Sequence, residues 1–332
     1  MTSNIVLSEK EFKAVGKRPI RHDGHDKVTG KALYGADISL PSLQFGGILR
    51  SPHPHARIIS IDTSRAEKHP GVTAIITGKD FPEQINQSVS VIPGPPLNLK
   101  HQTDNILAGA KVLYKGHAIA ALSASSGHLA EEALSLIDVK YEILPCTTNV
   151  EEALSETAPI LHDCYPGNIA SHTQIKLGDS ETPFEKADVV IEREFRTSTV
   201  HQGYIEPHSA TAWWTQNNKI TIWGSSQGHF QIRDKTSLVL GVPYSDIKVI
   251  PLEIGVGFGG KTTIYLEPIA ALLSKKSGHP VKVTMGRADV LEASGPTSGC
   301  YMKVKIGATN EGKLKAAHAI LKFEAGAFPG SP

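Results

Sequence analysis

The sequence lacks the features of a membrane protein or of a disulfide-bonded secreted one. No apolar stretch is long enough to cross a bilayer, and residues 1–17 are polar and charged where a secretory signal needs an apolar run. The three cysteines, Cys146, Cys164 and Cys300, are far apart and form no C-x-x-C pair. Nothing therefore supports a disulfide framework, a zinc site or an iron–sulfur cluster in this chain. We expect buried free thiols and a cytoplasmic protein without membrane insertion.

Strong net charge is also missing. The 332 residues include 34 Lys and Arg against 33 Asp and Glu, which gives no electrostatic reason to expect nucleic acid as a partner. A composition of 40% hydrophobic and 20% charged residues is typical of a globular chain of about two domains. No internal repeat or low-complexity tract indicates a solenoid or a disordered array.

The most informative stretch is a glycine-rich loop. A strand-like apolar run over residues 247–252 leads into a loop containing Gly255, Gly257, Gly259 and Gly260. Glycine reaches positive φ and lets the backbone approach a ligand closely, and successive N–H groups in such a loop can bind an anion. A helix is predicted after the loop, starting late because of a proline at 268. This layout of strand, glycine loop and helix is typical of phosphate binding.

One interpretation of the loop is a P-loop, because residues 255–262 match G-x-x-x-x-G-K-[ST] with Lys261 as the phosphate ligand. A P-loop protein builds most of its parallel sheet after this motif, and only residues 263–332 follow it here. The downstream runs 281–285 and 302–306 alternate like half-exposed antiparallel strands and end without a magnesium-binding aspartate. We keep a P-loop nucleotide-binding protein as an alternative.

The second interpretation rests on resemblance. Residues 201–207, 223–227, 240–243 and 257–261 together resemble the large subunit of the molybdenum hydroxylases, the xanthine dehydrogenase and aldehyde oxidase family. The resemblance runs from about Val15 to the last residue. Near the N-terminus, residues 29–37 and 47–57 resemble the opening of the small α/β hammerhead domain of that family.

The expected fold is α+β or mixed α/β. We predict an N-terminal arm (1–19), an α/β hammerhead domain (20–146), a linker (147–168) and the first, incomplete half of a molybdopterin-binding domain (169–332). Within these, patterning predicts the following elements: a β-α-β unit with strands 58–61 and 72–76 around helix 63–68, a long loop 81–102, a buried strand 116–124, helix 126–135, strand 137–141, strands 187–195, 210–214 and 219–223, and helix 231–240. Asn217 and Asn218 predict a hairpin turn.

The resemblance implies a molybdenum-pyranopterin cofactor, with its cytosine dinucleotide form as one candidate, and hydroxylation of an aromatic N-heterocycle or an aldehyde with water as oxygen source. Gln227 stands where the family places a glutamine beside an oxygen ligand of molybdenum, and an amide N–H₂ donates there without ionising. Gly257, Phe258, Gly259 and Gly260 match the loop whose N–H groups point at the cofactor and whose ring covers it.

Residues at the end of the glycine loop bear on which substrate the protein accepts. Purine-specific members of the family carry a substrate-binding glutamate directly after the lysine of the loop, and Thr262 stands there in this chain, so a purine substrate is disfavoured. We expect Lys261 to make structural contacts. Glu206 and Glu267, each followed by proline, are predicted to be structural rather than an acid–base pair.

The resemblance also implies what must come from elsewhere. The family's catalytic glutamate and its substrate-orienting arginines belong to a second half, so we expect no catalytic base in this chain. The expected partners are a polypeptide carrying that second half, an iron–sulfur subunit and a flavin subunit holding FAD. The chain is then either a natural split subunit, as in the nicotinate dehydrogenase type, or a fragment. A cofactor-free assembly scaffold with the same fold is the remaining alternative.

Overall fold

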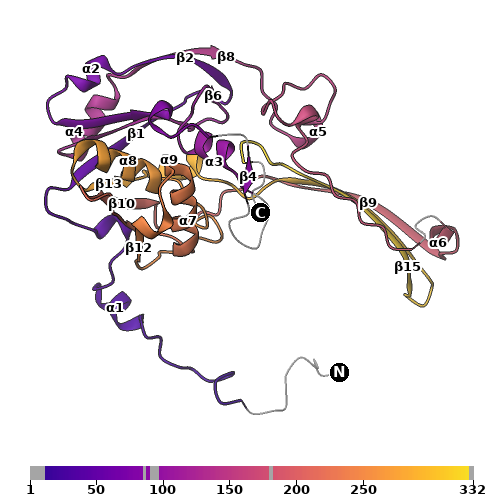
Figure 1. The fold of residues 1–332 in the computed structure, drawn as a ribbon. Helices are drawn as coiled ribbons and strands as arrows, with labels where there is room; N and C mark the ends of the chain where they lie inside the picture. The colour runs from indigo at the N-terminus through magenta and orange to yellow at the C-terminus, as the bar shows by residue number, and fades with distance from the viewer. Residues whose placement is uncertain (1–11, 85–86, 90–96, 179–181, 329–332) are drawn as a thin grey trace. The chain divides into compact units, whose positions relative to one another are not determined.

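The computed structural model describes residues 12–84, 87–89, 97–178 and 182–328 and divides into two compact units, Met1–Leu33 and Tyr34–Pro332 (Figure 1). Residues 1–11 of the predicted N-terminal arm lie outside the described residues. Within residues 12–33, the described part of the first unit, lies a short helix, α1 (Gly24–Thr29), which ends at Gly30 in the left-handed conformation.

The second unit is built on a seven-stranded mixed sheet that draws strands from both halves of the chain. The strand order is β12 (Ile247–Pro251), β11 (Ile220–Gly224), β10 (Ser209–Trp214), β13 (Val281–Thr284), β1 (Gln44–Arg50), β7 (Ala118–Ala124) and β3 (Val72–Thr77). The parallel pair of β1 with β13 joins the two sets of strands, with Gln44 opposite Val281. The mixed α/β fold class is therefore confirmed.

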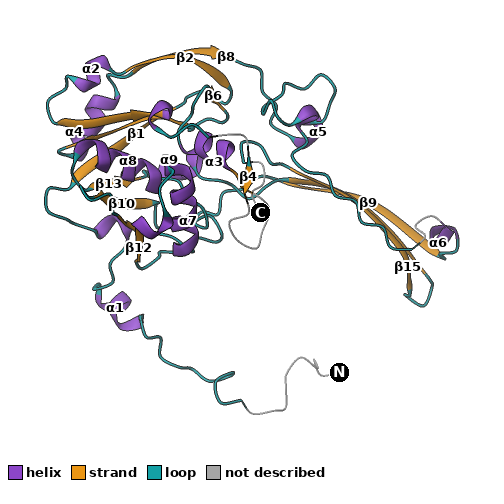
Figure 2. Cartoon of the chain, viewed as in Figure 1, coloured by secondary structure: helices purple, strands orange, loops and turns teal. Residues whose placement is uncertain are grey.

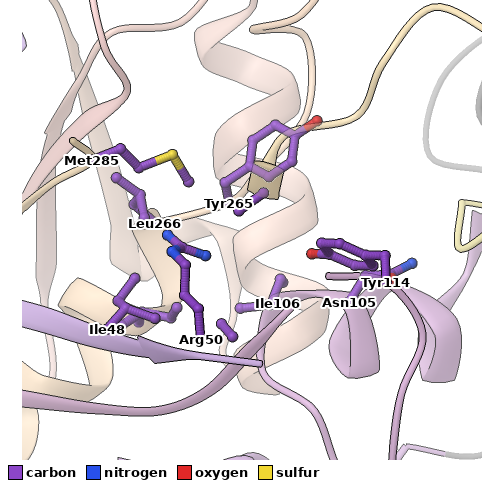
Figure 3. Close-up of a pocket in the computed structure, with 11 residues that line it drawn as sticks. Ile48, Arg50, Asn105, Ile106, Tyr114, Tyr265, Leu266 and Met285 are labelled. Atoms are coloured by element: carbon purple, nitrogen blue, oxygen red, sulfur yellow. The ribbon is translucent and has the colours of Figure 1, made fainter. Parts of the chain in front are cut away.

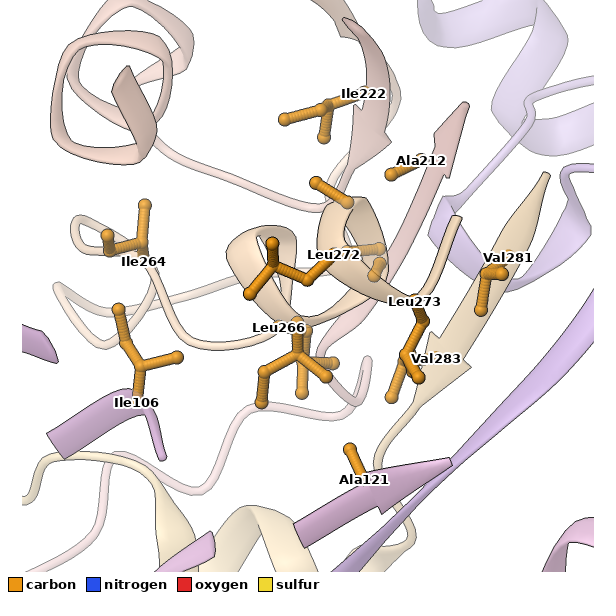
Figure 4. Packing of buried hydrophobic residues seen from close by; sticks show 14 of the residues in the cluster. Ile106, Ala121, Ala212, Ile222, Ile264, Leu266, Leu272, Leu273, Val281 and Val283 are labelled. Atoms are coloured by element: carbon orange, nitrogen blue, oxygen red, sulfur yellow. The ribbon is translucent and has the colours of Figure 1, made fainter. Parts of the chain in front are cut away.

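Helix α8 (Glu267–Ser277) fills the centre of the core. Its residues from Glu267 to Ser274 are all buried, because its apolar side chains face several neighbouring elements. Leu273 lies beside Val283 of β13 (Figure 4). Each buried side chain of this size stabilises the fold by about 1.5–3 kcal/mol. Pro268 sits in the first turn, where the missing N–H has no helical partner to lose.

The remaining strands form three smaller sheets (Figure 2). They are β6 (Lys111–Val112), β2 (Ala56–Asp62) and β8 (Asp138–Ile143); β15 (Leu314–Phe323), β14 (Cys300–Ala308) and β9 (Val189–Thr197); and the pair β4 (Ser88–Val89) and β5 (Leu97–Asn98). The other helices are α2 (Ser64–Glu67), α3 (Leu99–Ile106), α4 (Gly127–Leu134), α5 (Val150–Ala153), α6 (Thr182–Glu185), α7 (His229–Leu240) and α9 (Arg287–Ala293). Among the described residues no helix is both long and apolar enough to span a membrane.

Several predicted elements are confirmed. Strand β7 is buried along its whole length, and the Ser126 side chain caps α4 by accepting from the Leu129 N–H. Strands β10 and β11 form the predicted hairpin, with Asn218 in the left-handed conformation at its turn.

Three predictions need correction. Strands β2 and β3 belong to different sheets, so the predicted β-α-β unit does not exist. The four-residue α2 between them is too short to serve as a crossover connection. The predicted loop over residues 81–102 ends early, because Asn98 caps α3 with its side chain. Strand β13 lies inside the sheet and pairs with a parallel as well as an antiparallel neighbour.

The prediction of buried thiols holds only for Cys300. Cys146 and Cys164 are exposed, because both lie in the irregular segment between β8 and β9 rather than in a sheet. The Cys164 Sγ lies 3.2 Å from His101 Nε2.

Candidate functional site

Strand topology brings Gln227 and the glycine loop together. Strands β11 and β12 are parallel, and their last residues, Gly224 and Pro251, lie opposite each other. Gln227 follows the first strand and the loop follows the second, so both emerge at one edge of the sheet. The carboxyl ends of neighbouring parallel strands are a common place for ligand sites. Strand β10 is antiparallel to β11, which brings the segment before Ser209 to the same edge.

The Gln227 side chain is fixed by the loop. Its Oε1 accepts hydrogen bonds from the backbone N–H groups of Gly259 at 3.0 Å and Lys261 at 3.2 Å. Its own backbone N–H donates to the Lys261 carbonyl at 2.9 Å. Oε1 is occupied by these two hydrogen bonds. The other end of the amide, Nε2, has no partner among the described residues. An exposed, oriented N–H₂ donor is the result.

Two glycines of the loop are required by close packing. A Cβ on Gly257 would lie 2.4 Å from Gln227 Oε1, and a Cβ on Gly260 would lie 2.7 Å from Tyr204 Cε1. Neither distance is tolerable without movement of the neighbour. The glycines therefore let the loop pass directly over the Gln227 and Tyr204 side chains.

The loop is also strained. Val256 has φ 73° and Phe258 has φ 48°, and a left-handed conformation is a genuine outlier for a β-branched residue. Strain of this kind costs about 1–3 kcal/mol per residue and clusters at ligand sites. Both side chains are directed away from the core, since Phe258 is 68% exposed and Val256 44%. The strained conformation exposes the apolar side chains of Val256 and Phe258 on either side of Gly257.

The unpaired N–H groups lie in the same stretch. The N–H of Gly255 donates to Glu206, that of Gly259 to Gln227 and that of Gly260 to the Gly257 carbonyl. By contrast, the consecutive N–H groups of residues 256–258 donate to no acceptor among the described residues. Gly259, predicted to direct its N–H at a cofactor, instead uses it to hold Gln227. The three donors before it remain for an anion or a polar ligand.

A buried ion pair between Lys261 and Glu206 holds the glycine loop on its inner side. Lys261 Nζ lies 2.7 Å from Glu206 Oε2, and the two side chains are 0% and 11% exposed. Glu206 also accepts from the Gly255 N–H at 2.7 Å and the Gly35 N–H at 3.4 Å. Burial lowers the pKa of Lys261, and the Glu206 carboxylate opposes that fall. One carboxylate therefore ties both ends of the glycine loop together, which agrees with the structural role predicted for Glu206 and Lys261.

A hydrogen-bonded network lies next to this pair. The Tyr204 hydroxyl is 2.6 Å from His208 Nε2 and 3.1 Å from Ser294 Oγ, and His201 Nε2 is 2.8 Å from the same Ser294 oxygen. Burial, with Lys261 nearby, lowers the pKa of His208 to about 3, and burial raises the pKa of Tyr204. Both groups are therefore neutral near pH 7, and the network is a rigid support rather than a source of protons.

The geometry does not fit a P-loop. A P-loop lysine must reach bound phosphates, whereas the Lys261 side chain is buried and paired with Glu206. Helix α8 begins only at Glu267, several residues beyond the motif. The Thr262 hydroxyl, which would hold magnesium in a P-loop, donates to the Gly259 carbonyl at 2.9 Å.

We predict that the chain shows no specific heat of binding with Mg-ATP or Mg-GTP in titration calorimetry, because Lys261 has no free ammonium to offer a phosphate. The Lys261→Ala variant is the control. A micromolar affinity that disappears in this variant would restore the P-loop interpretation.

Glu267 is structural as predicted. It is buried, accepts from the Tyr265 N–H at 3.0 Å and has its pKa raised by burial. Sequence reasoning missed the support from Tyr204 and Ser294, and also the left-handed Val256. The only sequence signal for Val256 is a glycine on each side of it.

Two hollows among the described residues lie away from Gln227 and the glycine loop. The cavity lined by Arg50, Tyr114, Tyr265 and Met285 has a volume of about 10 Å³ (Figure 3), which is at the limit for a single water. An open hollow of about 680 Å³ lies at the hairpin turn, at the opposite end of β11 from Gln227. Since Gln227 and Phe258 are exposed, the candidate site lies at the protein surface.

Comparison with known families gives two matches that together cover most of the chain. Residues 161–331 match the family described as "Molybdopterin cofactor-binding domain". Residues 29–145 match "Aldehyde oxidase and xanthine dehydrogenase, a/b hammerhead domain". The chain belongs to the aldehyde oxidase and xanthine dehydrogenase family of molybdopterin-binding proteins.

Individual relatives agree with this assignment. The chain is 33% identical to a probable xanthine dehydrogenase subunit of Bacillus subtilis, over 93% of this chain and 40% of that protein. It is 30% identical to the nicotinate dehydrogenase large molybdopterin subunit of Eubacterium barkeri, over 96% of this chain and 72% of that subunit. The chain thus spans less than half the length of the first relative and most of the second.

Solved structures show the same fold. Reconstituted CO dehydrogenase from Oligotropha carboxidovorans matches with a TM-score of 0.80 and 30% identity, over 92% of this chain and 39% of that one. Quinoline 2-oxidoreductase from Pseudomonas putida 86 matches with a TM-score of 0.84 and 26% identity, over 94% and 39%.

Proposed function

We propose that the chain supplies one side of a molybdenum-pyranopterin site in a multi-subunit oxidoreductase that hydroxylates an aromatic N-heterocycle or an aldehyde with water as oxygen source. One observation carries the proposal. The Gln227 amide is locked with its N–H₂ outward, beside a strained loop with three consecutive N–H groups that have no acceptor in the described part of the chain. Family membership identifies the ligand class that such donors would meet.

The donor set fits this cofactor chemically. A pyranopterin with its phosphate presents anionic oxygens, and the sulfur and oxygen ligands of molybdenum accept hydrogen bonds. The N–H groups of residues 256–258 and Gln227 Nε2 are all neutral donors, so they can hold such acceptors without a counter-charge. The exposed Phe258 ring lies next in the chain and offers a flat apolar surface to a planar ring system.

Each residue then has a defined task. When bound, the cofactor supplies the two-electron oxidation of the substrate C–H bond. Gln227 donates a fixed hydrogen bond beside the metal, and the loop N–H groups orient the cofactor. Gly257 and Gly260 allow the backbone to come close enough, and the Lys261–Glu206 pair keeps the ends of the loop in register.

Substrate selection on this side of the site is weak. Thr262 carries no charge, and its hydroxyl is already used in a hydrogen bond to Gly259. We therefore propose a substrate other than a purine.

The catalytic base, the substrate-binding cations and the opposite wall belong to a partner polypeptide in this proposal. An iron–sulfur subunit and a flavin subunit carry the electrons away. The domain limits proposed are 20–146 for the hammerhead and 169–332 for the incomplete molybdopterin-binding domain.

Metal analysis of the complex purified from its native cell tests the proposal. We expect a stoichiometric amount of molybdenum per chain, with iron and flavin in the partner subunits. Mass analysis of the released pterin decides whether the dinucleotide is the cytosine form. A complex that contains the partners but no molybdenum would instead favour the cofactor-free scaffold.

A further inference from the structure

The sheet formed by β15, β14 and β9 has one face that nothing covers among the described residues. Side chains alternate along each strand, and the register places Phe195 opposite Met302 and Met302 opposite Leu321. Ile191, Ile306 and Phe323 lie on the same face by the same alternation. We call these six residues and the side chains between them the apolar sheet face. Strands β9 and β15 run together in Figure 1.

The opposite face of this sheet is different in kind. It carries Lys303, which pairs with Glu192, and Lys305, whose Nζ lies over the Phe184 ring of α6. A Cβ on Gly307 would lie 3.1 Å from both Phe184 and Ala187, so α6 and the residues after it pack against the Gly307 end of this polar face. The apolar sheet face has no such cover, since Phe195 is 51% exposed and Leu321 52%. Contiguous exposed apolar surface of this kind marks an interaction site.

A second observation points to the chemistry of the partner. Arg193 lies on the apolar sheet face, midway along β9 and opposite Val304. Its guanidinium contacts only the carbonyl of the adjacent Glu192 and has no ion-pair partner among the described residues. An arginine surrounded by apolar side chains suits a carboxylate on an occupant. A second copy of the chain packed on this face would bring a further Arg193 instead.

One end of this sheet also lies close to the glycine loop that follows β12. Val200, just after β9, forms a bridge with Thr297, just before β14. Between these points, Gln202 Nε2 donates to the Gly295 carbonyl, and its side chain lies against Gly260. The end of the sheet nearest Val200 and Thr297 is therefore connected through Gln202 to the glycine loop.

We propose that the apolar sheet face is the docking surface for the polypeptide that carries the remaining part of the molybdopterin-binding subunit; this inference rests on the proposed function. The chain covers only about 40% of the Bacillus subtilis relative, so a large part of that protein has no counterpart here. Permanent interfaces are more apolar than the small, transient ones used in electron transfer. The composition of the face therefore favours this polypeptide over an iron–sulfur subunit.

Photo-crosslinking in the native cell identifies the occupant. A photoactivatable phenylalanine analogue replaces Phe195 on the apolar sheet face, and in a control it replaces Tyr301 on the polar face. We expect a crosslink from position 195 to a polypeptide whose peptides align with the part of the relatives that this chain does not cover, and none from position 301. A crosslink to a second copy of this chain or to an iron–sulfur subunit would overturn the proposal, as would no crosslink from position 195.

A matched pair of substitutions measures the contribution of the face. Leu321→Glu and Ile320→Glu change adjacent residues of β15 with similar exposures of 52% and 43%, on opposite faces. With the crosslinked polypeptide purified as the binding probe, Leu321→Glu should raise the dissociation constant at least about tenfold, as loss of a central contact does. Ile320→Glu should leave it unchanged. Equal affinities for both variants, with circular dichroism showing folded proteins, would contradict the proposal.

The two proposals fail in different ways. Molybdenum in the native complex without the crosslink from position 195 would overturn the docking surface and leave the proposed function intact. The crosslink without molybdenum would overturn the proposed function and leave the docking surface intact.

Discussion

Lys261→Met should lower the free energy of unfolding by about 3–5 kcal/mol, the usual cost of removing one partner of a buried ion pair. The variant leaves the Glu206 carboxylate buried without its ammonium, while the hydrogen bond from the Gly255 N–H is retained. Urea unfolding followed by tryptophan fluorescence measures the difference.

A double-mutant cycle separates the pair from simple loss of packing. Lys261→Met combined with Glu206→Gln should cost less than the sum of the two single changes, because neither charge is then left alone. Lys219→Met is the matched surface control. It removes an ion pair with Asp246 whose lysine side chain is 58% exposed, and should cost less than about 1 kcal/mol. If Lys261→Met costs no more than this control, the pair does not support the loop.

Gln227→Ala should reduce turnover by about 100-fold or more, equivalent to about 3 kcal/mol, because a preorganised donor at a reacting centre contributes that much. The side chain is exposed and packs no large apolar group, so fold and assembly should remain, although the N–H groups of Gly259 and Lys261 lose their acceptor. Steady-state kinetics with metal analysis on the purified complex checks both parts.

Gln227→Glu tests which end of the amide matters. A carboxylate still accepts from the N–H groups of Gly259 and Lys261 and so keeps the loop in place, but near pH 7 it has no hydrogen to donate. We expect a loss of turnover as large as in Gln227→Ala. Unchanged turnover at full molybdenum loading in either variant would exclude Gln227 from the site.

Local signals in the sequence predicted local structure well. Ser126 marked the start of α4, Asn218 the hairpin turn and Pro268 the late start of α8, because capping, positive φ and the missing N–H act within a few residues. The separation of β2 and β3 into different sheets could not be predicted in this way, since it depends on pairing with strands more than forty residues away. Exposure of Cys146 and Cys164 likewise depends on what packs around the segment.

For the candidate site, the resemblance identified Gln227 and the glycine loop, and the structure explains why they are neighbours. Their proximity follows from the parallel pairing of β11 with β12, which no spacing in the sequence reveals. The left-handed Val256 and the carboxylate of Glu206 between Lys261, Gly255 and Gly35 are products of tertiary packing. Apart from the glycines on each side of Val256, the sequence carries no signal for either feature.

The parallel pairing of β1 with β13 limits how the two matched stretches of sequence can be combined in chimaeric proteins. The two family matches are written as separate stretches of sequence, yet Gln44, Phe45 and Gly46 pair with residues of the second stretch inside one continuous sheet. A Cβ on Gly46 would lie 2.5 Å from the Val283 side chain, so a side chain at position 46 would collide with β13. A chimaera that takes its hammerhead from one relative and its molybdopterin-binding stretch from another must therefore inherit a compatible β1 and β13 together.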